Sequence, residues 1–465
     1  MFPFGAPRSR RHLFVAAAFA LMTAATFVVG HAQDGNGSVS ADVGPASDND
    51  PTFYADVLPI LQENCQACHR SGGLDLGGMT APMALTSYEE ARPWAPMIAD
   101  AVAEGRMPPW HAHPQHQGQF QNERYLAPED RETLIAWAEG GAPAGDPADA
   151  PSQVSFAELE TNEDGWSIGQ PDLVLTFDEP YLVEDHVEDE YANIPVHVSE
   201  EDVPEPMWIK KSELFAGSHA VHHIISDVGS LVPGIEPTVY RDGFARLLQP
   251  GPRNILFQMH YHKQPGPGTA VYDQSRAGVI FYEPGEVIEH MVTNAPMGMF
   301  TFVIPAGDPD YSMSTREVFE EDTYILNFTP HMHLRGKAAR YELTYPDGES
   351  EVLLYVPNYD FNWQHTYELK EPVLAPAGSV LELTLWWDNS ENNPHNPDPT
   401  VDVRWGQPTT DEMGFGFVGI ASAEPLNLVV GEPIPQEVLD AAGSGSILDA
   451  IDPTFLLNLG GDRPQ

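Results

Sequence analysis

The chain has 465 residues, of which 42% are hydrophobic, and its formal net charge is −47 at pH 7. This length allows several domains with their own cores, and the composition excludes a disordered chain. Because so acidic a surface repels phosphate groups, the charge argues against nucleic-acid binding and against docking on anionic membranes. It favours solubility in salty or exposed surroundings, or a cationic redox partner.

The first 32 residues have the features of a secretory signal peptide. An arginine cluster from Arg8 to Arg11 precedes the apolar stretch Leu13–Val29, and small residues end at Ala32. We expect cleavage near Ala32, which makes the mature protein periplasmic or secreted. An uncleaved anchor is the alternative, because the apolar stretch is slightly long. No later stretch is apolar enough to span a bilayer, so we expect no membrane insertion after cleavage.

A small all-α domain is predicted over residues 51–145, after a polar spacer at residues 33–50. The segment Phe53–Asn64 has the pattern of a short amphipathic helix. A second helix is predicted at Pro128–Glu139, because proline and acidic residues mark its start and Gly140 follows its end. Between Gly141 and Ser155 the chain is rich in glycine, alanine, proline and aspartate, and residues 146–170 are interpreted as a linker.

A mainly β module is predicted over residues 171–423. Short β-branched and aromatic runs such as Leu173–Phe177 and Tyr324–Phe328 alternate there with turn residues. This alternation of short runs and turn residues is typical of antiparallel strands and predicts two antiparallel β-sandwiches. We place the sandwiches at residues 171–285 and 286–423. A tail of unknown role follows at residues 424–465, with a weak helix at Pro435–Ala442.

The chain has two cysteines, and both lie in the string Cys65-Gln66-Ala67-Cys68-His69. In a CxxCH string the two thiols bond to the haem vinyl groups and the histidine binds the iron. A redox or zinc pair is the alternative for CxxC alone, but here the histidine follows directly and no second cysteine pair exists. We therefore expect covalent haem c on Cys65 and Cys68, with His69 as an axial ligand.

A methionine further along is expected to be the sixth iron ligand. The candidates are Met79, Met83, Met97 and Met107. Met107 is preferred because the two prolines after it stiffen the loop that must hold the sulfur. Residues 51–145 also resemble class I cytochrome c domains, with a helix before CxxCH, a methionine loop and a closing helix. Three nearby histidines are expected to be solvated loop residues, and any of them replacing Met107 would lower the potential: His111, His113 and His116.

Histidine groups recur along the β module. They are His219 with His222-His223, then His260-Tyr261-His262, then His331-Met332-His333, and the string Thr409-Thr410-Asp411-Glu412-Met413 follows them. Residues two apart on a strand share a face, so His331 and His333 can share a metal. Adjacent His222 and His223 can do so only at a bulge or strong twist. Imidazole suits copper, zinc and iron, whereas an added thioether favours Cu(I). Any one group alone is better explained by ordinary exposed or hydrogen-bonded histidines.

In this order the HH, HYH, HxH and TxDEM strings resemble the copper type II, ascorbate-dependent monooxygenase family, which includes peptidylglycine hydroxylating monooxygenase and dopamine β-monooxygenase. The resemblance covers roughly residues 171–423. It implies two β-sandwiches with a cleft between them and two copper ions. The electron-storing copper would be held by His222, His223 and His260, and the oxygen-binding copper by His331, His333 and Met413.

The sequence departs from that family in two respects. Animal members are braced by disulfides, which this module lacks. Peptidylglycine enzymes bind the substrate carboxylate with an arginine two residues before the HxH pair, and Thr329 stands there in this chain. An α-amidating role is therefore not expected.

The resemblance implies an enzyme that hydroxylates a C–H bond of a small organic substrate with O2. We expect the fused haem to relay electrons from an external one-electron donor to the copper at His222, His223 and His260, because a linker raises the effective concentration. The main alternative is an electron-transfer or copper-binding haem protein without oxygenase activity. A dehydrogenase that passes electrons outward through the haem is a further alternative, for which the sequence shows no cofactor motif.

Overall fold

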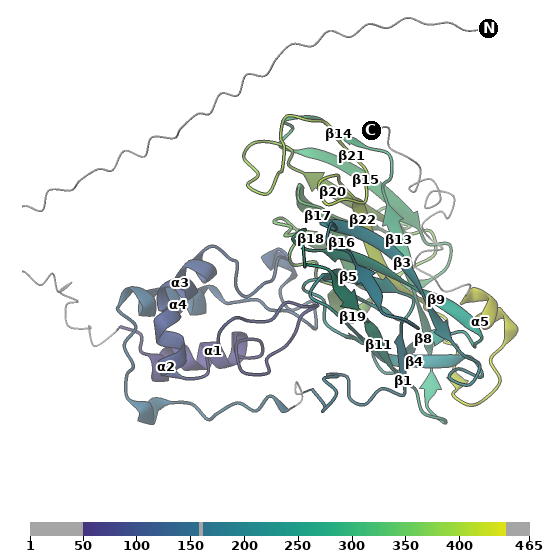
Figure 1. Ribbon diagram of the computed structural model, residues 1–465, viewed down its shortest axis with the longest axis horizontal. Helices are drawn as coiled ribbons and strands as arrows, with labels where there is room; N and C mark the ends of the chain where they lie inside the picture. The colour runs from purple at the N-terminus through teal and green to yellow at the C-terminus, as the bar shows by residue number, and fades with distance from the viewer. Residues whose placement is uncertain (1–49, 158–160, 443–465) are drawn as a thin grey trace, which may run out of the picture. The chain divides into compact units, whose positions relative to one another are not determined.

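A computed structural model of the protein describes residues 50–157 and 161–442. These residues are mainly β, with several sheets and few helices (Figure 1). The predicted signal peptide at residues 1–32 lies outside the described residues, as do nearly all of the spacer and the end of the tail. Among the helices that are described, none is long and apolar enough to cross a membrane.

Most of the helical segments precede the sheets. They are η1 (Phe53–Val57), α1 (Leu58–Asn64), α2 (Tyr88–Ala91), η2 (Arg92–Trp94), α3 (Ala95–Ala103), η3 (Pro114–His116), α4 (Pro128–Glu139) and η4 (Pro147–Asp149), and α5 (Gln436–Ala441) follows the strands. η1 and α1 follow each other directly and together cover the predicted helix Phe53–Asn64. α4 has the predicted bounds and ends at Gly140. The weak helix predicted at Pro435–Ala442 is also confirmed, as α5.

Residues 53–142 have a hydrophobic core of their own. Phe53 of η1 and Trp137 of α4 are fully buried, and their ring centroids lie 6.0 Å apart. The Trp137 indole N–H donates to the carbonyl of Pro143 at 3.0 Å, so burial leaves this donor satisfied. Complete burial of a side chain the size of Phe53 contributes about 2 kcal/mol. Packing of η1 against α4 therefore holds the start and end of this region together.

The strands fall into two groups along the chain. The first group comprises β1 (Leu173–Thr176), β2 (Tyr181–Val183), β3 (Asp189–Val198), β4 (Met207–Phe215), β5 (Val221–Ser226), β6 (Gly229–Leu231), β7 (Thr238–Val239), β8 (Phe244–Leu248), β9 (Arg253–His262), β10 (Val271–Asp273) and β11 (Arg276–Phe281). The second group comprises β12 (Val287–Ile288), β13 (His290–Gly298), β14 (Val303–Ile304), β15 (Tyr311–Val318), β16 (Thr323–Met332), β17 (Gly336–Thr344), β18 (Ser350–Val356), β19 (Tyr367–Ala375), β20 (Val380–Trp387), β21 (Val403–Arg404), β22 (Gly414–Ser422) and β23 (Leu428–Val429).

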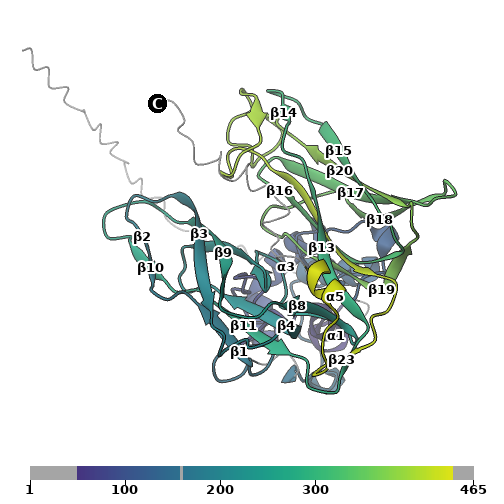
Figure 2. The same cartoon turned by 90° about the vertical axis from the view of Figure 1, so that its right-hand side faces the viewer.

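Each group packs around one core. In the first group, β1-β11-β4-β8 and β3-β9-β5-β6 contribute side chains such as Phe257 and Val279 to a shared cluster. In the second group, β13-β22-β16-β19 and β15-β20-β17-β18 do the same with Phe328 and Leu383. The two groups are separate in Figure 2, with β8 and β13 between them.

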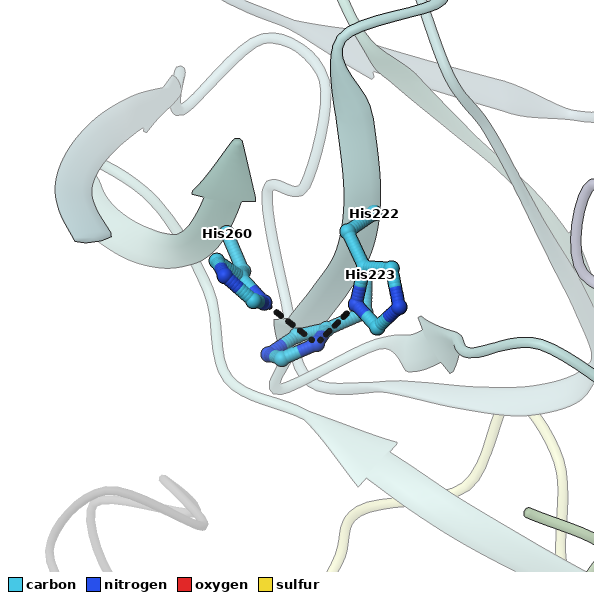
Figure 3. A group of neighbouring side chains, drawn as sticks. All are labelled: His222, His223 and His260. Atoms are coloured by element: carbon cyan, nitrogen blue, oxygen red, sulfur yellow. Dashed lines mark hydrogen bonds between the residues drawn. The ribbon is translucent and has the colours of Figure 1, made fainter. Parts of the chain in front are cut away.

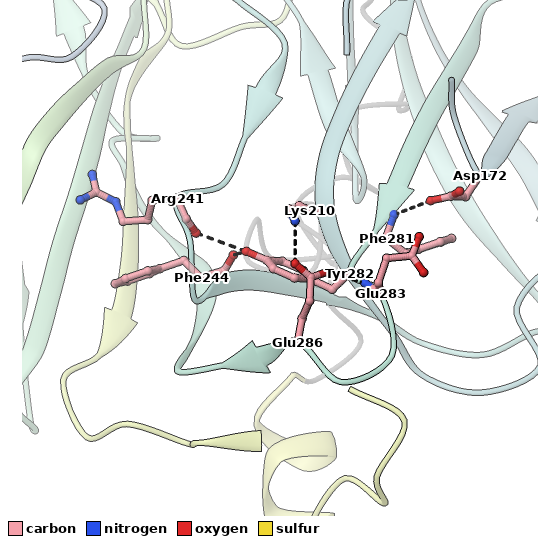
Figure 4. Close-up of polar contacts among 8 residues, drawn as sticks. All are labelled: Asp172, Lys210, Arg241, Phe244, Phe281, Tyr282, Glu283 and Glu286. Atoms are coloured by element: carbon pink, nitrogen blue, oxygen red, sulfur yellow. Dashed lines mark hydrogen bonds and ion pairs between the residues drawn. The ribbon is translucent and has the colours of Figure 1, made fainter. Parts of the chain in front are cut away.

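One sheet continues through both groups, because β13 pairs in parallel with β8 at His290 and Met291. The predicted boundary at residue 285 lies in the turn after β11, where polar contacts attach the chain to the first group (Figure 4). The Tyr282 hydroxyl donates to the carbonyl of Phe244 at 2.9 Å, and Lys210 pairs with Glu286 at 2.7 Å. Polar contacts made by residues just before and just after the boundary therefore attach the junction to the first group.

The middle of the loop between α3 and α4 packs on the second β core, whereas Leu126 at its end packs on the helical core. Phe120 is fully buried in the second β core, and the His113 amide donates to Tyr355 at 2.7 Å. His116 is only 2% exposed, and its Nδ1 hydrogen bonds with Gln119 at 2.9 Å. The prediction that His116 is a solvated loop residue is wrong, because Phe120 draws the loop into the sheet core. His111 and His113 are half-buried as well.

Candidate metal centres

The first histidine cluster lies where β5 pairs with β9. Along β9 the side chains of Phe257 and Met259 enter the core, so His260 points to the opposite face. His223 of β5 is the cross-strand partner of His260, and the register shifts between Val221 and His223. This irregularity confirms the prediction that His222 and His223 can share a site only where the strand is distorted.

The three imidazoles converge through their Nδ1 atoms (Figure 3). Nδ1 of His223 lies 3.3 Å from Nδ1 of His222 and 3.3 Å from Nδ1 of His260. Two nitrogens bound to one ion at about 2.0 Å, with a tetrahedral angle between them, lie roughly 3.3 Å apart. The spacing of these nitrogens therefore fits a single metal ion between the rings.

Burial favours the neutral form of two imidazoles of this cluster, His222 and His223, and metal binding requires neutral imidazole. Burial and the neighbouring His260 lower the pKa of His222 to about 4, and the pKa of His223 is lowered well below its usual value for the same reasons. A set of three imidazole ligands suits copper and zinc alike. The donor set alone thus indicates a metal without choosing between the two.

Asp189 and Tyr191 of β3 fix the orientation of His260. The carboxylate of Asp189 lies 2.7 Å from Nε2 of His260, and the Tyr191 ring stacks on the imidazole with centroids 4.2 Å apart. β3 pairs with β9 so that Tyr191 is directly opposite His260. Sequence reasoning missed both residues, since only the register of β3 against β9 shows that they belong to the site.

The second group forms where β16 pairs with β22. Phe328 and Met332 of β16 enter the core, whereas His331 lines a cavity on the other face. Met332 is the partner of Gly414, the first residue of β22, and His333 follows Met332 in the chain while Met413 precedes Gly414. Strand pairing thus joins the HxH string to the TxDEM string.

Hydrogen bonds fix both imidazoles of this second group. Nδ1 of His331 lies 2.6 Å from Oε1 of Gln364, and Nδ1 of His333 lies 3.3 Å from the carbonyl of Asp411. The His333 amide donates to the buried Glu412 carboxylate at 2.9 Å. Burial lowers the pKa of His333 to about 3, so its ring is neutral. With each Nδ1 engaged in this way, Nε2 is the atom that faces a metal.

Both candidate centres face one cavity of about 630 Å³. Its lining includes His223 of the first cluster, and His331 and Met413 of the second. Phe361 contacts both clusters, because its ring centroid lies 5.6 Å from that of His222 and 5.9 Å from that of His333. The ring of Phe361 therefore lies beside one histidine of each group.

The part of the lining that adjoins His331 on β16 is polar. Thr329 lies there and shares a hydrogen bond with Thr366 at 2.8 Å between their hydroxyl oxygens. Asn327 donates to the carboxylate of Glu368 at 3.1 Å. Burial raises the pKa of Glu368 to about 7. This part of the lining thus offers hydroxyl, amide and carboxyl groups for hydrogen bonds.

The CxxCH string follows α1, and a polar contact at Nδ1 fixes the ring of its histidine. Nδ1 of His69 lies 3.2 Å from the carbonyl of Met83, which leaves Nε2 for an iron ligand. Burial raises the pKa of the Cys65 thiol to about 12, so thiolate chemistry is disfavoured at this position. These features fit a haem attachment site better than a redox or zinc pair.

Among the candidate sixth ligands, two are poorly placed. The backbone carbonyl of Met83 contacts Nδ1 of His69, on the side that would not hold an iron ion, and Met97 is 55% exposed on α3. Met79 forms an isolated bridge with Leu76, and Met107 is half-buried after α3. The assignment of Met107 stays a prediction.

No family model matches the sequence, and no curated protein sequence does either. Solved structures that can be aligned include infectious bursal disease virus, Gx strain (7% identity, 54% of this chain and 67% of that chain, TM-score 0.18), and the VP2 subviral particle of the same virus (10% identity, 60% and 77%, TM-score 0.17). A third is dimeric latent PorU from Porphyromonas gingivalis (9% identity, 50% and 34%, TM-score 0.11). Scores this low carry no argument about fold or function.

Proposed function

We propose that this protein is an exported copper-dependent monooxygenase that hydroxylates a C–H bond of a small organic substrate with O2, using electrons relayed by a covalently attached haem c. The observation that carries the proposal is the convergence of His223, His331 and Met413 on one cavity. The proposal includes a cytochrome c-like domain at residues 51–145 and two β-sandwiches that each hold one copper. It also includes a periplasmic or secreted location and an external one-electron donor.

Hydroxylation places one oxygen atom of O2 in the C–H bond and releases the other as water, which consumes two electrons and two protons. Two bound copper ions supply this one-electron redox chemistry. The protein's own part is to keep the imidazoles neutral, to orient them through Asp189 and Gln364, and to bring substrate and metal together in one cavity. Preorganised ligands of this kind lose little free energy to rearrangement during the reaction.

Differences between the two donor sets support different roles. The first cluster offers three imidazoles on rigid strands, which suits a copper that only stores an electron. The second combines two imidazoles with the thioether of Met413, a soft donor that stabilises Cu(I). Because Cu(I) is the state that reacts with O2, we assign oxygen chemistry to His331, His333 and Met413, and electron storage to His222, His223 and His260.

The cavity limits the choice of substrate. A volume of about 630 Å³ suits a small molecule and not a folded protein. Thr329 offers a hydroxyl where peptidylglycine enzymes carry an arginine, and the lining also includes the side chains of Arg124 and Arg246. We therefore propose a compact, partly polar organic substrate, and no α-amidating role.

The function can be tested by following the haem absorbance of the reduced, copper-loaded protein after O2 and candidate substrates are added. We expect fast reoxidation in the wild type, slow reoxidation in Met413→Ala, and wild-type behaviour in the control Met97→Ala, whose side chain is exposed. Equal rates in the wild type and Met413→Ala would contradict the oxygenase function. In that case, an absence of reductant-dependent O2 uptake would favour an electron-transfer or copper-binding haem protein.

A further inference from the structure

The loop between α3 and α4 contains a segment, residues Gln119–Arg124, that lies along β19 at the edge of its sheet; we call it the lining segment. The Gln119 carbonyl accepts a hydrogen bond from the Lys370 amide at 2.8 Å. The Gln121 amide donates to the carbonyl of Glu368, also at 2.8 Å. The segment is therefore paired with the β module, although in sequence it belongs to the helical region.

Two side chains anchor the lining segment as well. Phe120 forms an antiparallel bridge with Leu369 and is fully buried in the second β core. The Asn122 side chain donates to the carbonyl of Thr366 at 2.7 Å, and its Oδ1 accepts a hydrogen bond from the Glu368 amide at 3.2 Å. Both ends of the Asn122 amide are thus engaged in holding the segment against β19.

The lining segment contributes to the cavity that contains His331 and Met413. Four consecutive residues of the segment are among those that line it: Gln121, Asn122, Glu123 and Arg124. The other lining residues lie between Tyr191 and Phe417, in the β module. Without the helical region the cavity would therefore lack part of its lining.

Arg124 brings an unused hydrogen-bond donor to this lining. Its Nη2 pairs with the carboxylate of Glu236, which also lines the cavity. Its Nη1 is buried, and no group among residues 50–157 and 161–442 accepts a hydrogen bond from it. A buried N–H without an acceptor is rare, because it has lost water and gained no partner. Since a guanidinium group can only donate, the partner that Nη1 lacks is an acceptor such as an oxygen atom.

The apolar part of the lining is aromatic. It includes Tyr191, Trp405, Phe415 and Phe417. Small-molecule sites commonly combine apolar walls of this kind with a few polar groups that fix the orientation of the ligand. A ligand that uses both features has an apolar body and at least one oxygen acceptor.

We propose that the lining segment is part of the substrate site, and that Nη1 of Arg124 donates a hydrogen bond to a carbonyl, amide or carboxylate oxygen of the substrate. The identification of this ligand as the substrate rests on the proposed function, whereas binding itself requires no copper. The helical region then has a role besides carrying the haem, because it helps to select the substrate. Arg124 is the residue that sets this specificity.

Binding is tested in full-length, haem-loaded protein from which copper has been removed with a chelator, so that no probe can bind to copper. Three probes share a benzene ring and differ in the polar group. Benzamide and benzoate offer oxygen acceptors, whereas benzylamine at pH 7 offers only ammonium donors. We expect isothermal titration calorimetry to show that benzylamine binds about 10-fold more weakly than benzamide, because it cannot accept from Nη1. Benzamide binding no tighter than benzylamine binding would overturn the proposal.

The donor is tested with Arg124→Lys. Lysine keeps a cation for Glu236 but lacks the second nitrogen of the guanidinium fork. We expect the affinity for benzamide and benzoate to fall about 10-fold, with the affinity for benzylamine unchanged. Arg131→Lys makes the same change at an exposed position of α4 and should bind all three probes as the wild type does. Equal benzamide affinity in Arg124→Lys and the wild type would contradict the role of Nη1.

Glu236→Gln separates the donor from the ion pair. This variant removes the paired carboxylate and leaves Arg124 in place, so we expect the affinity for benzamide to be retained. A loss as large as that in Arg124→Lys would mean that the ion pair only shapes the loop, and the assignment of Nη1 to the substrate would fail.

The carboxylates of the haem are a second source of acceptor oxygens near Arg124. Burial raises the pKa of the Cys68 thiol and the charge of Arg124 opposes that rise, so Arg124 acts on the haem attachment site. A changed haem potential in Arg124→Lys, together with unchanged benzamide affinity, would assign Nη1 to the haem and overturn the proposal. Failure of the oxygenase function is distinguishable, because loss of oxygenase chemistry leaves the affinities of the copper-free protein as they are.

Discussion

The carboxylate of Asp189 lies 2.7 Å from Nε2 of His260, on the opposite side of the imidazole from the Nδ1 that faces His223. A carboxylate in this position fixes the ring and makes its other nitrogen a better donor. We therefore expect Asp189→Asn to weaken copper binding at the first cluster by about 10- to 100-fold. Competition with a copper chelator measures the affinity.

A matched control for this variant is Asp310→Asn, which removes an exposed carboxylate that pairs with Lys337 at 2.6 Å. The control should bind copper as the wild type does. If Asp189→Asn and Asp310→Asn bind the first copper equally well, Asp189 does not support His260 as a ligand.

Gln364 plays the corresponding part at the second centre, because its Oε1 lies 2.6 Å from Nδ1 of His331. Gln364→Leu removes the acceptor and keeps much of the volume, so we expect the second copper to bind about 10- to 100-fold more weakly. Gln249→Leu, which loses only a 3.4 Å contact with the carbonyl of Leu439, is the control. Unchanged affinity in Gln364→Leu, measured in protein whose first site is filled, would contradict this role.

Parts of this arrangement could be predicted from the sequence, because they depend on local patterns. The helix Pro128–Glu139 was defined by its start and stop residues, and the distortion at His222 followed from two adjacent histidines that must face one metal. The histidines themselves were recognisable by residue type and spacing. Each of these signals lies within a few neighbouring residues.

Other parts depend on the pairing of distant segments and could not be predicted. Asp189 is 71 residues from His260, and Gln364 is 33 residues from His331. Only strand register and loop packing bring such pairs together. The same holds for His116, which the burial of Phe120 carries into a sheet core. The parallel pairing of β8 with β13, which makes one sheet continuous across the predicted boundary, likewise has no local signal.

Stability should depend on pH through Glu368. Burial raises its pKa to about 7 from an ordinary value of 4.5. Between these two values the folded state holds a proton that the unfolded chain has released, so the free energy of unfolding falls as the pH rises from about 4.5 through 7. Because glutamine does not titrate, Glu368→Gln does not lose this free energy of unfolding as the pH rises. We expect it to be more stable than the wild type at pH 8, by at most about 3 kcal/mol, and no more stable at pH 4.5.

Denaturant unfolding of both proteins at the two pH values measures this difference. Cavity water reduces the effect, because the Glu368 side chain is partly exposed. The exposed neighbour Glu371 supplies the control, Glu371→Gln, which should not gain stability between pH 4.5 and pH 8. A stability difference between Glu368→Gln and the wild type that does not change with pH would refute the role of this carboxyl.

The sixth haem ligand can be identified by three alanine variants. We expect Met107→Ala to convert the haem from a six-coordinate low-spin form to a high-spin form, because the iron loses its thioether. Met79→Ala and Met97→Ala should keep the wild-type absorption and EPR spectra. A low-spin spectrum in Met107→Ala together with a high-spin one in Met79→Ala would transfer the ligand role to Met79.

X-ray absorption of the haem-loaded protein with its copper reduced tests the central claim most directly, since it reports both the number of bound coppers and the atoms around them. We expect two coppers for each chain, nitrogen scattering from imidazoles, and a sulfur contribution that disappears in Met413→Ala but persists in Met97→Ala. Fewer than two coppers, or no sulfur contribution in the wild type, would contradict the assignment of two centres distinguished by one methionine.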